Sequence, residues 1–227
     1  MRDPEADDCC GPRADPRVAR RFDREYASWT EQEGFPKMVD VSARLLDLLR
    51  DATRQKPSVL EIGCGTGALS VALLEMGAAS ARGIDLSAAS VEVARQRASA
   101  AGVGERATFE VGHAAALGGG SVDWVVADRV LCCDGRPWPL LEAAIGAARN
   151  RIAISVPESR GWRGLVNRPM WAAEAAWDVW RGGCRGYVHD LRRVEHRLRA
   201  AGFTPARSAR VGLWWLGVYE RAIDGGG

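Results

Sequence analysis

A glycine-rich turn is the segment of this sequence best suited to binding a ligand. The run Val59–Gly67 reads VLEIGCGTG, an apolar stretch that leads into a tight turn. Glycines permit positive φ and let a ligand lie against the backbone, and the N–H groups of the following helix point at that ligand. Such a turn alone is weak evidence, because Gly63, Gly65 and Ala68 also satisfy the G-x-G-x-x-A form of nicotinamide or flavin binding.

Two acidic residues indicate which ligand the turn favours. Glu61 lies two residues before the first glycine, where a carboxylate suits a cation such as an amino acid ammonium and is awkward beside a pyrophosphate. Asp85 ends the next apolar run, in the segment Gly83–Ser87. An acidic residue that ends the second strand accepts the ribose hydroxyls of adenosine ligands. The two carboxylates therefore favour a positively charged adenosine compound.

These residues require an alternation of strands and helices to position them. The predicted strands are Ser58–Ile62, Ala81–Asp85, Ala107–Val111, Val122–Ala127 and Arg151–Val156. The predicted helices between them are Ala68–Met76, Ala88–Ala101 and Pro139–Ala148. Such alternation is typical of a mostly parallel sheet with helices on both faces.

The two ends of the chain break this rhythm. Residues 16–51 show helical periodicity, interrupted at Gly34–Pro36. After the fifth strand, a long insertion is followed by a predicted helix at His189–Ala201 and by two strands, Phe203–Arg210 and Leu213–Arg221. A terminal hairpin differs from the sixth parallel strand of an ordinary dinucleotide-binding domain.

With this layout the sequence resembles the class I S-adenosylmethionine-dependent methyltransferases, most closely at Glu61–Gly67 and Asp85. The resemblance implies a Rossmann-like, seven-stranded, mostly parallel sheet with helices on both faces and a C-terminal antiparallel hairpin. It implies S-adenosyl-L-methionine as the cofactor. It also divides the chain into an N-terminal tail and helical cap, 1–56, and a methyltransferase domain, 57–227, with a helical acceptor-side insertion at about 158–188.

The resemblance also implies roles for individual residues. The implied cofactor-binding residues are Tyr26, Glu61, Gly63, Gly65, Gly67, Asp85, Leu86, His113 and Asp128. The glycines and Glu61 face the methionine end, Asp85 takes the ribose hydroxyls and Leu86 packs on the adenine. His113 departs from the family, which often has an acidic residue there that contacts the adenine amino group. A loop histidine facing water is the alternative for His113.

The segment after the fourth strand resembles a particular subgroup of this family. Asp128–Cys133 reads DRVLCC, and this D-R-V-x-C-C stretch is similar to that of proteins related to magnesium-protoporphyrin O-methyltransferase. The N-terminal Cys9–Pro12, CCGP, is similar as well. A sulfonium methyl is already activated, so alignment and exclusion of water supply much of the catalysis.

The candidate catalytic residues of this sequence are Asp128, Arg129 and His189. A carboxylate acceptor needs only positioning, which Arg129 or Arg163 provides by bidentate pairing. A phenol or amine gains from a base, for which Asp128 or His189 is a candidate. The structural alternatives are a loop cap for Asp128, a surface ion pair for Arg129 and a helix start for His189, since Asp190 is a good N-cap.

The six cysteines are Cys9, Cys10, Cys64, Cys132, Cys133 and Cys184. None has C-x-x-C spacing, so we predict no metal site and interpret them as reduced thiols. Cys132 and Cys133 are most simply small buried hydrophobes, but a thiol or metalloid acceptor would give them a role, since soft ligands prefer thiolate.

Four tryptophans of the insertion suggest an apolar lid over the acceptor: Trp162, Trp171, Trp177 and Trp180. The alternative is that Trp177 and Trp180 pack this helix onto the sheet. Tyr26 and Trp29 would close the donor side.

Composition limits the partners. The chain has 227 residues, 31 Lys and Arg and 29 Asp and Glu, so its net charge of +2 argues against a nucleic-acid substrate. It shows no apolar run long enough for a membrane span and no signal peptide, which favours a cytoplasmic location. We expect a monomer or a homodimer. We expect methyl transfer to oxygen, of a hydroxyl or carboxylate, on a hydrophobic or aromatic small molecule. The alternatives are S- or metalloid-methylation, a nicotinamide-dependent oxidoreductase, and a non-catalytic binding protein.

Overall fold

The computed structural model describes residues 16–30, 33–114, 121–180 and 185–221, without the side chains of 178–180. The expectations for Cys9, Cys10 and Cys184 lie outside the described residues, as does the tail at the start of the predicted cap.

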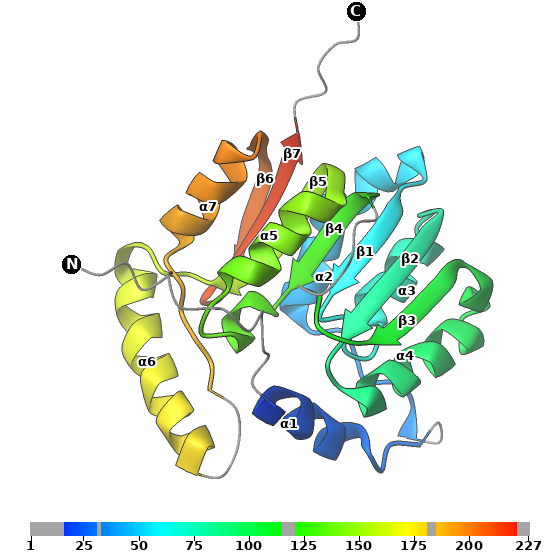
Figure 1. Cartoon of the computed structure of the whole chain (residues 1–227), viewed down its shortest axis with the longest axis horizontal. Helices are drawn as coiled ribbons and strands as arrows, with labels where there is room; N and C mark the ends of the chain where they lie inside the picture. Colours follow the sequence, from blue (N-terminus) through cyan, green and yellow to red (C-terminus); the bar gives the residue numbers. More distant parts are fainter. Residues whose placement is uncertain (1–15, 31–32, 115–120, 181–184, 222–227) are drawn as a thin grey trace, which may run out of the picture.

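Seven strands form one sheet in the order β3-β2-β1-β4-β5-β7-β6 (Figure 1). Their bounds are β1 Ser58–Ile62, β2 Ser80–Asp85, β3 Ala107–Val111, β4 Val122–Asp128, β5 Ala148–Pro157, β6 Phe203–Val211 and β7 Trp214–Arg221. Strands β1 to β5 are parallel, whereas β7 runs antiparallel to both β5 and β6. The predicted fold class is therefore confirmed, including the antiparallel hairpin at the C-terminal end.

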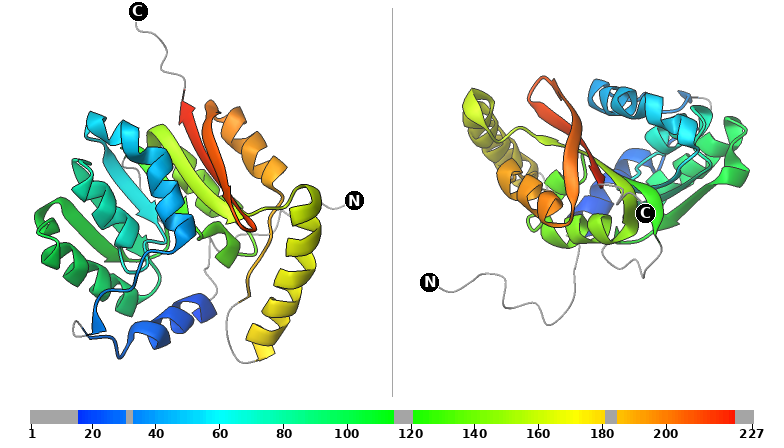
Figure 2. Two further views of the ribbon diagram at one scale, coloured as in Figure 1. Left: turned by 180° about the vertical axis from the view of Figure 1, so that it is seen from behind. Right: turned by 90° about the horizontal axis from the view of Figure 1, so that it is seen from above.

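The central strands are buried on both faces, as expected for a parallel sheet between helices. Along β4, Trp124 and Val126 belong to the core on one face, and Val125 and Ala127 to the core on the other. The helices are α1 Pro16–Tyr26, α2 Asp40–Leu49, α3 Ala68–Glu75, α4 Ala88–Ala100, α5 Trp138–Ala147, α6 Gly161–Trp180 and α7 Leu191–Ala200. Helices α2, α3 and α4 cover the first face, and α5 and α7 cover the second (Figure 2).

The two helices of the predicted N-terminal cap lie in different places. Helix α2 packs on one face of the sheet, whereas α1 lies over the end of the sheet. Leu45 and Leu49 of α2 are fully buried against the sheet. Helix α1 lies beyond the ends of β1 and β2 and is fastened to α4 by Asp23, whose Oδ1 accepts hydrogen bonds from Ser87 Oγ at 2.7 Å and Ala89 N at 3.2 Å (Figure 1). Asp23 thus caps α4 from another helix.

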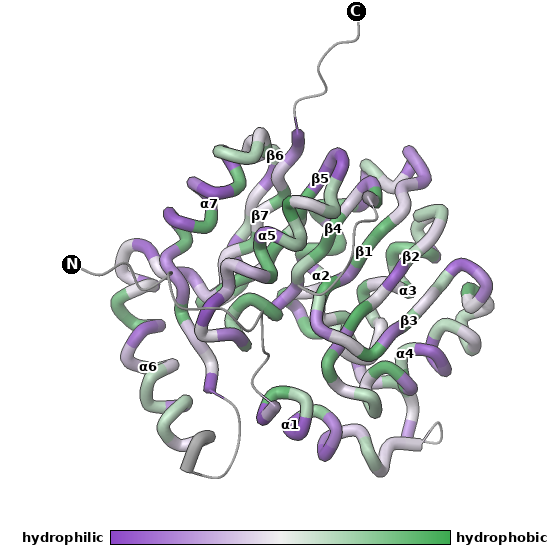
Figure 3. The backbone as a smooth tube through the Cα atoms, viewed as in Figure 1, coloured by the Kyte–Doolittle hydropathy of each residue, from purple (hydrophilic) through white to green (hydrophobic). Residues whose placement is uncertain are grey.

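A buried asparagine anchors helix α6 to neighbouring segments of the chain. The fully buried Asn167 donates from Nδ2 to the carbonyls of Glu158 and Leu213, both at 2.8 Å. Helix α6 exposes five large apolar side chains, those of Trp162, Leu165, Val166, Met170 and Trp177, and green segments along its tube in Figure 3 mark its hydrophobic residues. Across the described ranges, no helix combines the length and hydropathy that a membrane crossing requires.

Helix α7 begins two residues later than the sequence predicts. Asp190 is its N-cap and accepts a hydrogen bond from Arg192 N at 2.9 Å, which leaves His189 outside the helix. The preference of Asp for the N-cap therefore decides the boundary.

Candidate active site

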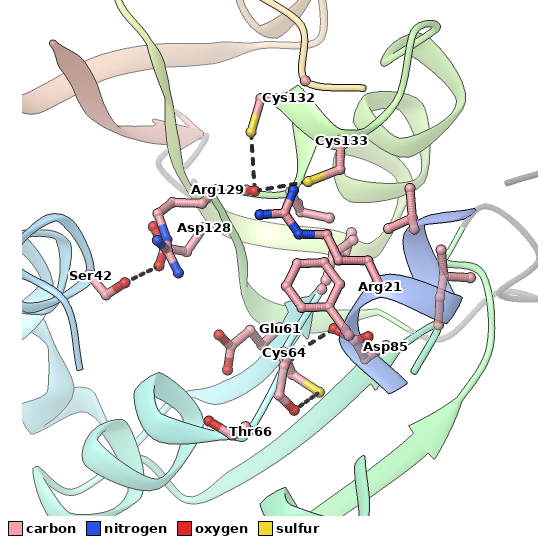
Figure 4. Close-up of a pocket in the computed structure, with 18 of the residues that line it drawn as sticks. Arg21, Ser42, Glu61, Cys64, Thr66, Asp85, Asp128, Arg129, Cys132 and Cys133 are labelled. Atoms are coloured by element: carbon pink, nitrogen blue, oxygen red, sulfur yellow. Dashed lines mark hydrogen bonds between the residues drawn. The ribbon is translucent and has the colours of Figure 1, made fainter. Parts of the chain in front are cut away.

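A cavity of about 760 Å³ opens where β1, β2 and β4 end, between α1 and α6 (Figure 4). Nine of the residues expected in the site line it: Tyr26, Glu61, Gly63, Gly65, Asp85, Leu86, His113, Asp128 and Arg129. The strand order explains why these residues share one cavity. Strands β2 and β3 lie on one side of β1 and strands β4 and β5 on the other, and this topological switch point leaves a crevice between β1 and β4.

The glycine turn is held against the end of β2 by backbone hydrogen bonds. Gly63 N and Cys64 N both donate to Ile84 O, at 2.8 and 3.1 Å, and Gly65 N donates to Asp85 Oδ2 at 2.8 Å. All three glycines of the turn have positive φ, between 49° and 72°. The carboxylate of Asp85 thus shapes the turn and lines the pocket.

The first two glycines differ in what a side chain would meet. A Cβ atom built at Gly63 would lie 2.5 Å from Val130 Cγ2, whereas one at Gly65 meets nothing within 4 Å. Gly65 therefore exposes its backbone to the pocket, so a ligand can lie directly against the main chain there.

We expect Gly63→Ala and Gly65→Ala to have separable effects. Both place alanine at positive φ, which costs about 1–2 kcal/mol, and Gly63→Ala adds about 1–3 kcal/mol of overpacking against Val130. Gly65→Ala puts its methyl group into the pocket, so it should weaken binding of S-adenosylhomocysteine at least ~10-fold, or about 1.4 kcal/mol. Urea unfolding and calorimetric titration of both variants test this. Equal losses of stability would contradict the contact with Val130.

Glu61 is a buried carboxyl group with few partners. It is 3% exposed, and the hydrogen bonds it accepts come from Ser70 N, at 3.0 Å, and Ser70 Oγ. Burial raises the pKa of Glu61 to about 8, and the charges of Asp128 and Asp85 act in the same direction. A cation in the pocket would reverse this cost, so the group fits an ammonium.

Asp85 presents the second carboxylate expected in the site. Its Oδ1 accepts a hydrogen bond from Ser87 N at 2.9 Å, and its Oδ2 accepts the bond from Gly65 N described above. Burial raises the pKa of Asp85, while these backbone N–H groups oppose the rise. Leu86 and His113 also line the pocket. Two carboxylates beside an open glycine backbone fit a cationic adenosine ligand.

Asp128 is fixed by two hydroxyl groups. Its Oδ2 accepts a hydrogen bond from Ser42 Oγ of α2, and its Oδ1 accepts one from Ser155 Oγ of β5. Ser155 Oγ also accepts from Arg129 N, at 2.8 Å, and Arg129 has a φ of 52°. Asp128 therefore joins α2 to the sheet at the wall of the pocket. Sequence reasoning missed Ser42, because its role depends on a residue 86 positions away.

The structure places His189 away from the pocket lining. Its Nε2 lies 2.9 Å from Leu131 O and 2.8 Å from Asp134 O, a position suited to an N–H that donates a hydrogen bond to these carbonyls. Burial lowers the pKa of His189. The ring therefore ties the turn after β4 to the segment before α7, and the expected role as a base finds no support in this position.

Two further expectations also differ from the observed positions. Gly67 is not among the lining residues, and a Cβ there would lie 2.9 Å from Ala94 Cβ, so this glycine permits close packing of α3 on α4. Arg163 donates from Nε to Gly212 O at 3.3 Å and stacks over Trp162, outside the pocket.

Part of the pocket lining comes from α6 and β7. Trp171 and Trp214 meet edge to face, with ring centroids 5.7 Å apart, and both line the pocket beside Met170. Trp162 and Trp177 point outward and are 62% and 57% exposed, while the side chain of Trp180 lies outside the described residues. Of the four tryptophans in the predicted lid, Trp171 lines the pocket.

Arg185 is a lining residue that sequence reasoning missed. It follows α6, and its guanidinium lies 5.4 Å from the centroid of the Tyr187 ring. Tyr187 N donates to Cys132 O at 2.8 Å, which holds this segment against the turn after β4. Arg185 therefore joins Arg21, Lys37 and Arg129 as a cationic residue that lines the cavity.

Comparisons with known proteins agree with this geometry. Residues 59–151 match a family model described as a methyltransferase domain. The crystal structure of magnesium protoporphyrin IX methyltransferase from Synechocystis PCC 6803 with bound SAH has a TM-score of 0.69 and 21% identity, covering 90% of this chain and 98% of that one. An O-methyltransferase family protein from Burkholderia thailandensis gives a TM-score of 0.65 and 19% identity, covering 79% and 56%. At these identities the likeness concerns the fold.

Curated relatives match only part of the chain. The ribosomal protein L11 methyltransferase of an Exiguobacterium species is 35% identical over 83 residues, which is 37% of this chain and 27% of that protein. The norajmaline N-methyltransferase of Rauvolfia serpentina is 31% identical over 83 residues, 37% and 28% respectively. The chain thus spans about a quarter of the length of these relatives.

Proposed function

Because the chain contains a class I S-adenosylmethionine-dependent methyltransferase domain, we propose that it methylates an oxygen atom, of a hydroxyl or a carboxylate, on a hydrophobic or aromatic small molecule. The observation that supports this acceptor is one cavity whose lining includes the glycine turn, the apolar side chains of Met170, Trp171 and Trp214, and arginines that include Arg129 and Arg185.

The donor half of the cavity supports binding of S-adenosylmethionine, which supplies an activated methyl group on a sulfonium. Glu61 would hold the ammonium, Asp85 the ribose hydroxyls, and Leu86 would pack on the adenine. The open backbone at Gly65 lets the cofactor lie close to the turn. Tyr26, on α1, would cover the crevice and exclude water.

The acceptor half supports positioning of a flat apolar molecule. Met170, Trp171 and Trp214 offer an apolar surface, and Arg129 or Arg185 would orient an acceptor carboxylate by charge-assisted hydrogen bonds. A carboxylate needs no base, so this chemistry requires only alignment. For a hydroxyl acceptor, Asp128 would act as the base that takes the proton.

The test is transfer from the methyl-labelled cofactor to extracts of small molecules and to extract protein. We expect label in the organic-soluble fraction. Alkali will release it as methanol from a methyl ester and leave it in place in an aryl ether, which separates the two oxygen acceptors. Label found only in precipitated protein would contradict the proposal and favour a protein acceptor.

Arg185→Ala should affect the acceptor and leave the cofactor unaffected. Loss of a charge-assisted hydrogen bond costs about 1.5–3 kcal/mol, so we expect KM for a carboxylate acceptor to rise at least ~10-fold, or about 1.4 kcal/mol. Calorimetric affinity for S-adenosylhomocysteine should stay the same. Arg193→Ala, at an exposed position on α7, is the matched control. An unchanged KM would remove Arg185 from the acceptor site.

A further inference from the structure

Two adjacent thiols lie in the wall of the pocket, and the proposed methyl transfer uses neither. Cys132 and Cys133 form the turn η5, Leu131–Cys133, directly after β4, and both line the cavity (Figure 4). Cys132 is buried and Cys133 is half-buried. Both are free cysteines in the described part of the chain.

The side chains of the two cysteines converge. Cys132 Sγ lies 3.2 Å and Cys133 Sγ 3.6 Å from the same atom, Arg129 O. The left-handed backbone of Arg129, with a φ of 52°, directs this carbonyl at the turn. Adjacent side chains on a helical turn ordinarily diverge, so the shared acceptor brings the sulfur atoms to one side.

The surroundings favour the reactive form of one thiol. The neighbouring Cys132 thiol lowers the pKa of Cys133, and the charges of Arg21 and Arg129 act in the same direction, while burial and the charge of Asp85 oppose them. The proximity of Cys133 and burial raise the pKa of Cys132. Thiolate is the nucleophile and the soft ligand, so Cys133 is placed to react first and Cys132 to follow.

The described residues show no third ligand beside the pair. No cluster of three or more His, Cys, Asp or Glu side chains that could hold a metal ion occurs within the described ranges. Zinc, which prefers four ligands, is therefore disfavoured. A trivalent arsenic centre that carries one organic group needs only two sulfur atoms, and soft thiolates suit it.

We propose that Cys132 and Cys133 form a two-thiol binding site for trivalent organoarsenicals inside the acceptor half of the pocket. The arsenic of R–As=O forms one As–S bond with each sulfur, the As=O bond breaks, and the two thiol protons leave with the oxygen as water. No atom changes oxidation state. The resulting ring contains one atom more than the strained ring of a disulfide between neighbours.

If the chain has the proposed function, an arsenical bound to Cys132 and Cys133 would block methyl transfer. An occupied site would fill space beside Arg129 and exclude the methyl acceptor. The donor half, at Glu61 and Asp85, would remain open. We therefore expect an arsenical to inhibit methyl transfer without weakening the binding of S-adenosylhomocysteine.

The probe is phenylarsine oxide. The full chain also contains a second pair of adjacent cysteines, Cys9 and Cys10, which serves as a comparison. In a Cys9→Ser, Cys10→Ser and Cys184→Ser background, intact mass and thiol counting should show one arsenical bound and two thiols lost. Ethanedithiol should reverse the binding, and a monothiol should not.

Adding Cys132→Ser or Cys133→Ser to that background should lower the affinity for phenylarsine oxide at least ~100-fold, or about 2.7 kcal/mol. Cys64→Ser, at a buried cysteine of the glycine turn, should leave the affinity for phenylarsine oxide unchanged. Cys132→Ala is the alternative if serine at the buried position prevents folding, which binding of S-adenosylhomocysteine will report.

Uptake that survives loss of either cysteine, or that disappears with Cys9 and Cys10, would overturn the proposal. Stoichiometric uptake with a weakened affinity for S-adenosylhomocysteine would contradict the assigned position. Mass and thiol counts need no methyl transfer, so failure of the proposed function is distinguishable from failure of the dithiol site.

Discussion

Glu61→Gln is expected to weaken binding of S-adenosylmethionine about 100-fold and to stabilise the ligand-free protein at alkaline pH. Glutamine keeps an oxygen for Ser70 but cannot pair with an ammonium. The loss of a buried charge-assisted hydrogen bond costs about 1.5–3 kcal/mol, and 100-fold corresponds to about 2.7 kcal/mol. Calorimetric titration and urea unfolding of the same samples measure both effects.

The gain in stability follows from the pKa of Glu61. Burial raises this pKa from 4.5 in the unfolded chain to about 8 in the folded protein. The folded state therefore binds more protons than the unfolded state between these values, and its stability falls as pH rises from about 4.5 to about 8. The difference in unfolding free energy between wild type and Glu61→Gln should change by several kcal/mol over this range. A difference independent of pH would contradict the buried, protonated carboxyl.

Cofactor binding should then be linked to proton release. An ammonium beside Glu61 favours the ionised form, so binding below pH 8 expels a proton and affinity rises with pH. Calorimetry in buffers with different heats of ionisation counts the protons. Glu110→Gln is a control, because Glu110 pairs with Arg82 on the surface at 2.8 Å. Equal proton counts for wild type and Glu61→Gln would assign the release to another group.

Asp85→Ala is expected to abolish measurable cofactor binding, with a loss of at least ~1000-fold, or about 4 kcal/mol. The substitution removes the acceptor for the ribose hydroxyls. It also leaves Gly65 N and Ser87 N without the partners observed at 2.8 and 2.9 Å. Each buried N–H left unpaired costs about 1–3 kcal/mol, so the glycine turn itself should loosen and the unfolding free energy should fall.

A matched control separates the two roles of Asp85. Asp123 has a similar structural role at the other end of the sheet, where its Oδ2 accepts hydrogen bonds from Ser58 N at 2.8 Å and Ser58 Oγ at 2.7 Å. Asp123→Ala should lower stability and leave cofactor affinity unchanged. Comparable losses of affinity in the two variants would show that general destabilisation, rather than a missing ligand contact, explains Asp85→Ala.

The strands, the hairpin and the donor side of the site follow from short stretches of sequence. Both faces of β1 and β4 are apolar, so their runs are readable without a partner strand. The turn after β1 requires glycine at positive φ, and this constraint is local. Glu61 and Asp85 lie at fixed distances from the turn along the chain, and parallel strands bring their carboxyl ends to one edge. The meeting of these two carboxylates in one pocket was therefore predictable.

The acceptor side could be decided only by the tertiary structure. Trp171 meets Trp214 from a helix and a strand 43 residues apart, and Ser42 reaches Asp128 from another helix. His189 was a reasonable base by residue type, yet two backbone carbonyls hold its ring outside the pocket. Sequence alone determined the strands, the hairpin and the glycine turn, because each of these depends on residues that are close together along the chain. The packing of α2 and α6 against the sheet decided which remote side chains share the cavity, because such contacts depend on how helices dock and not on any local pattern.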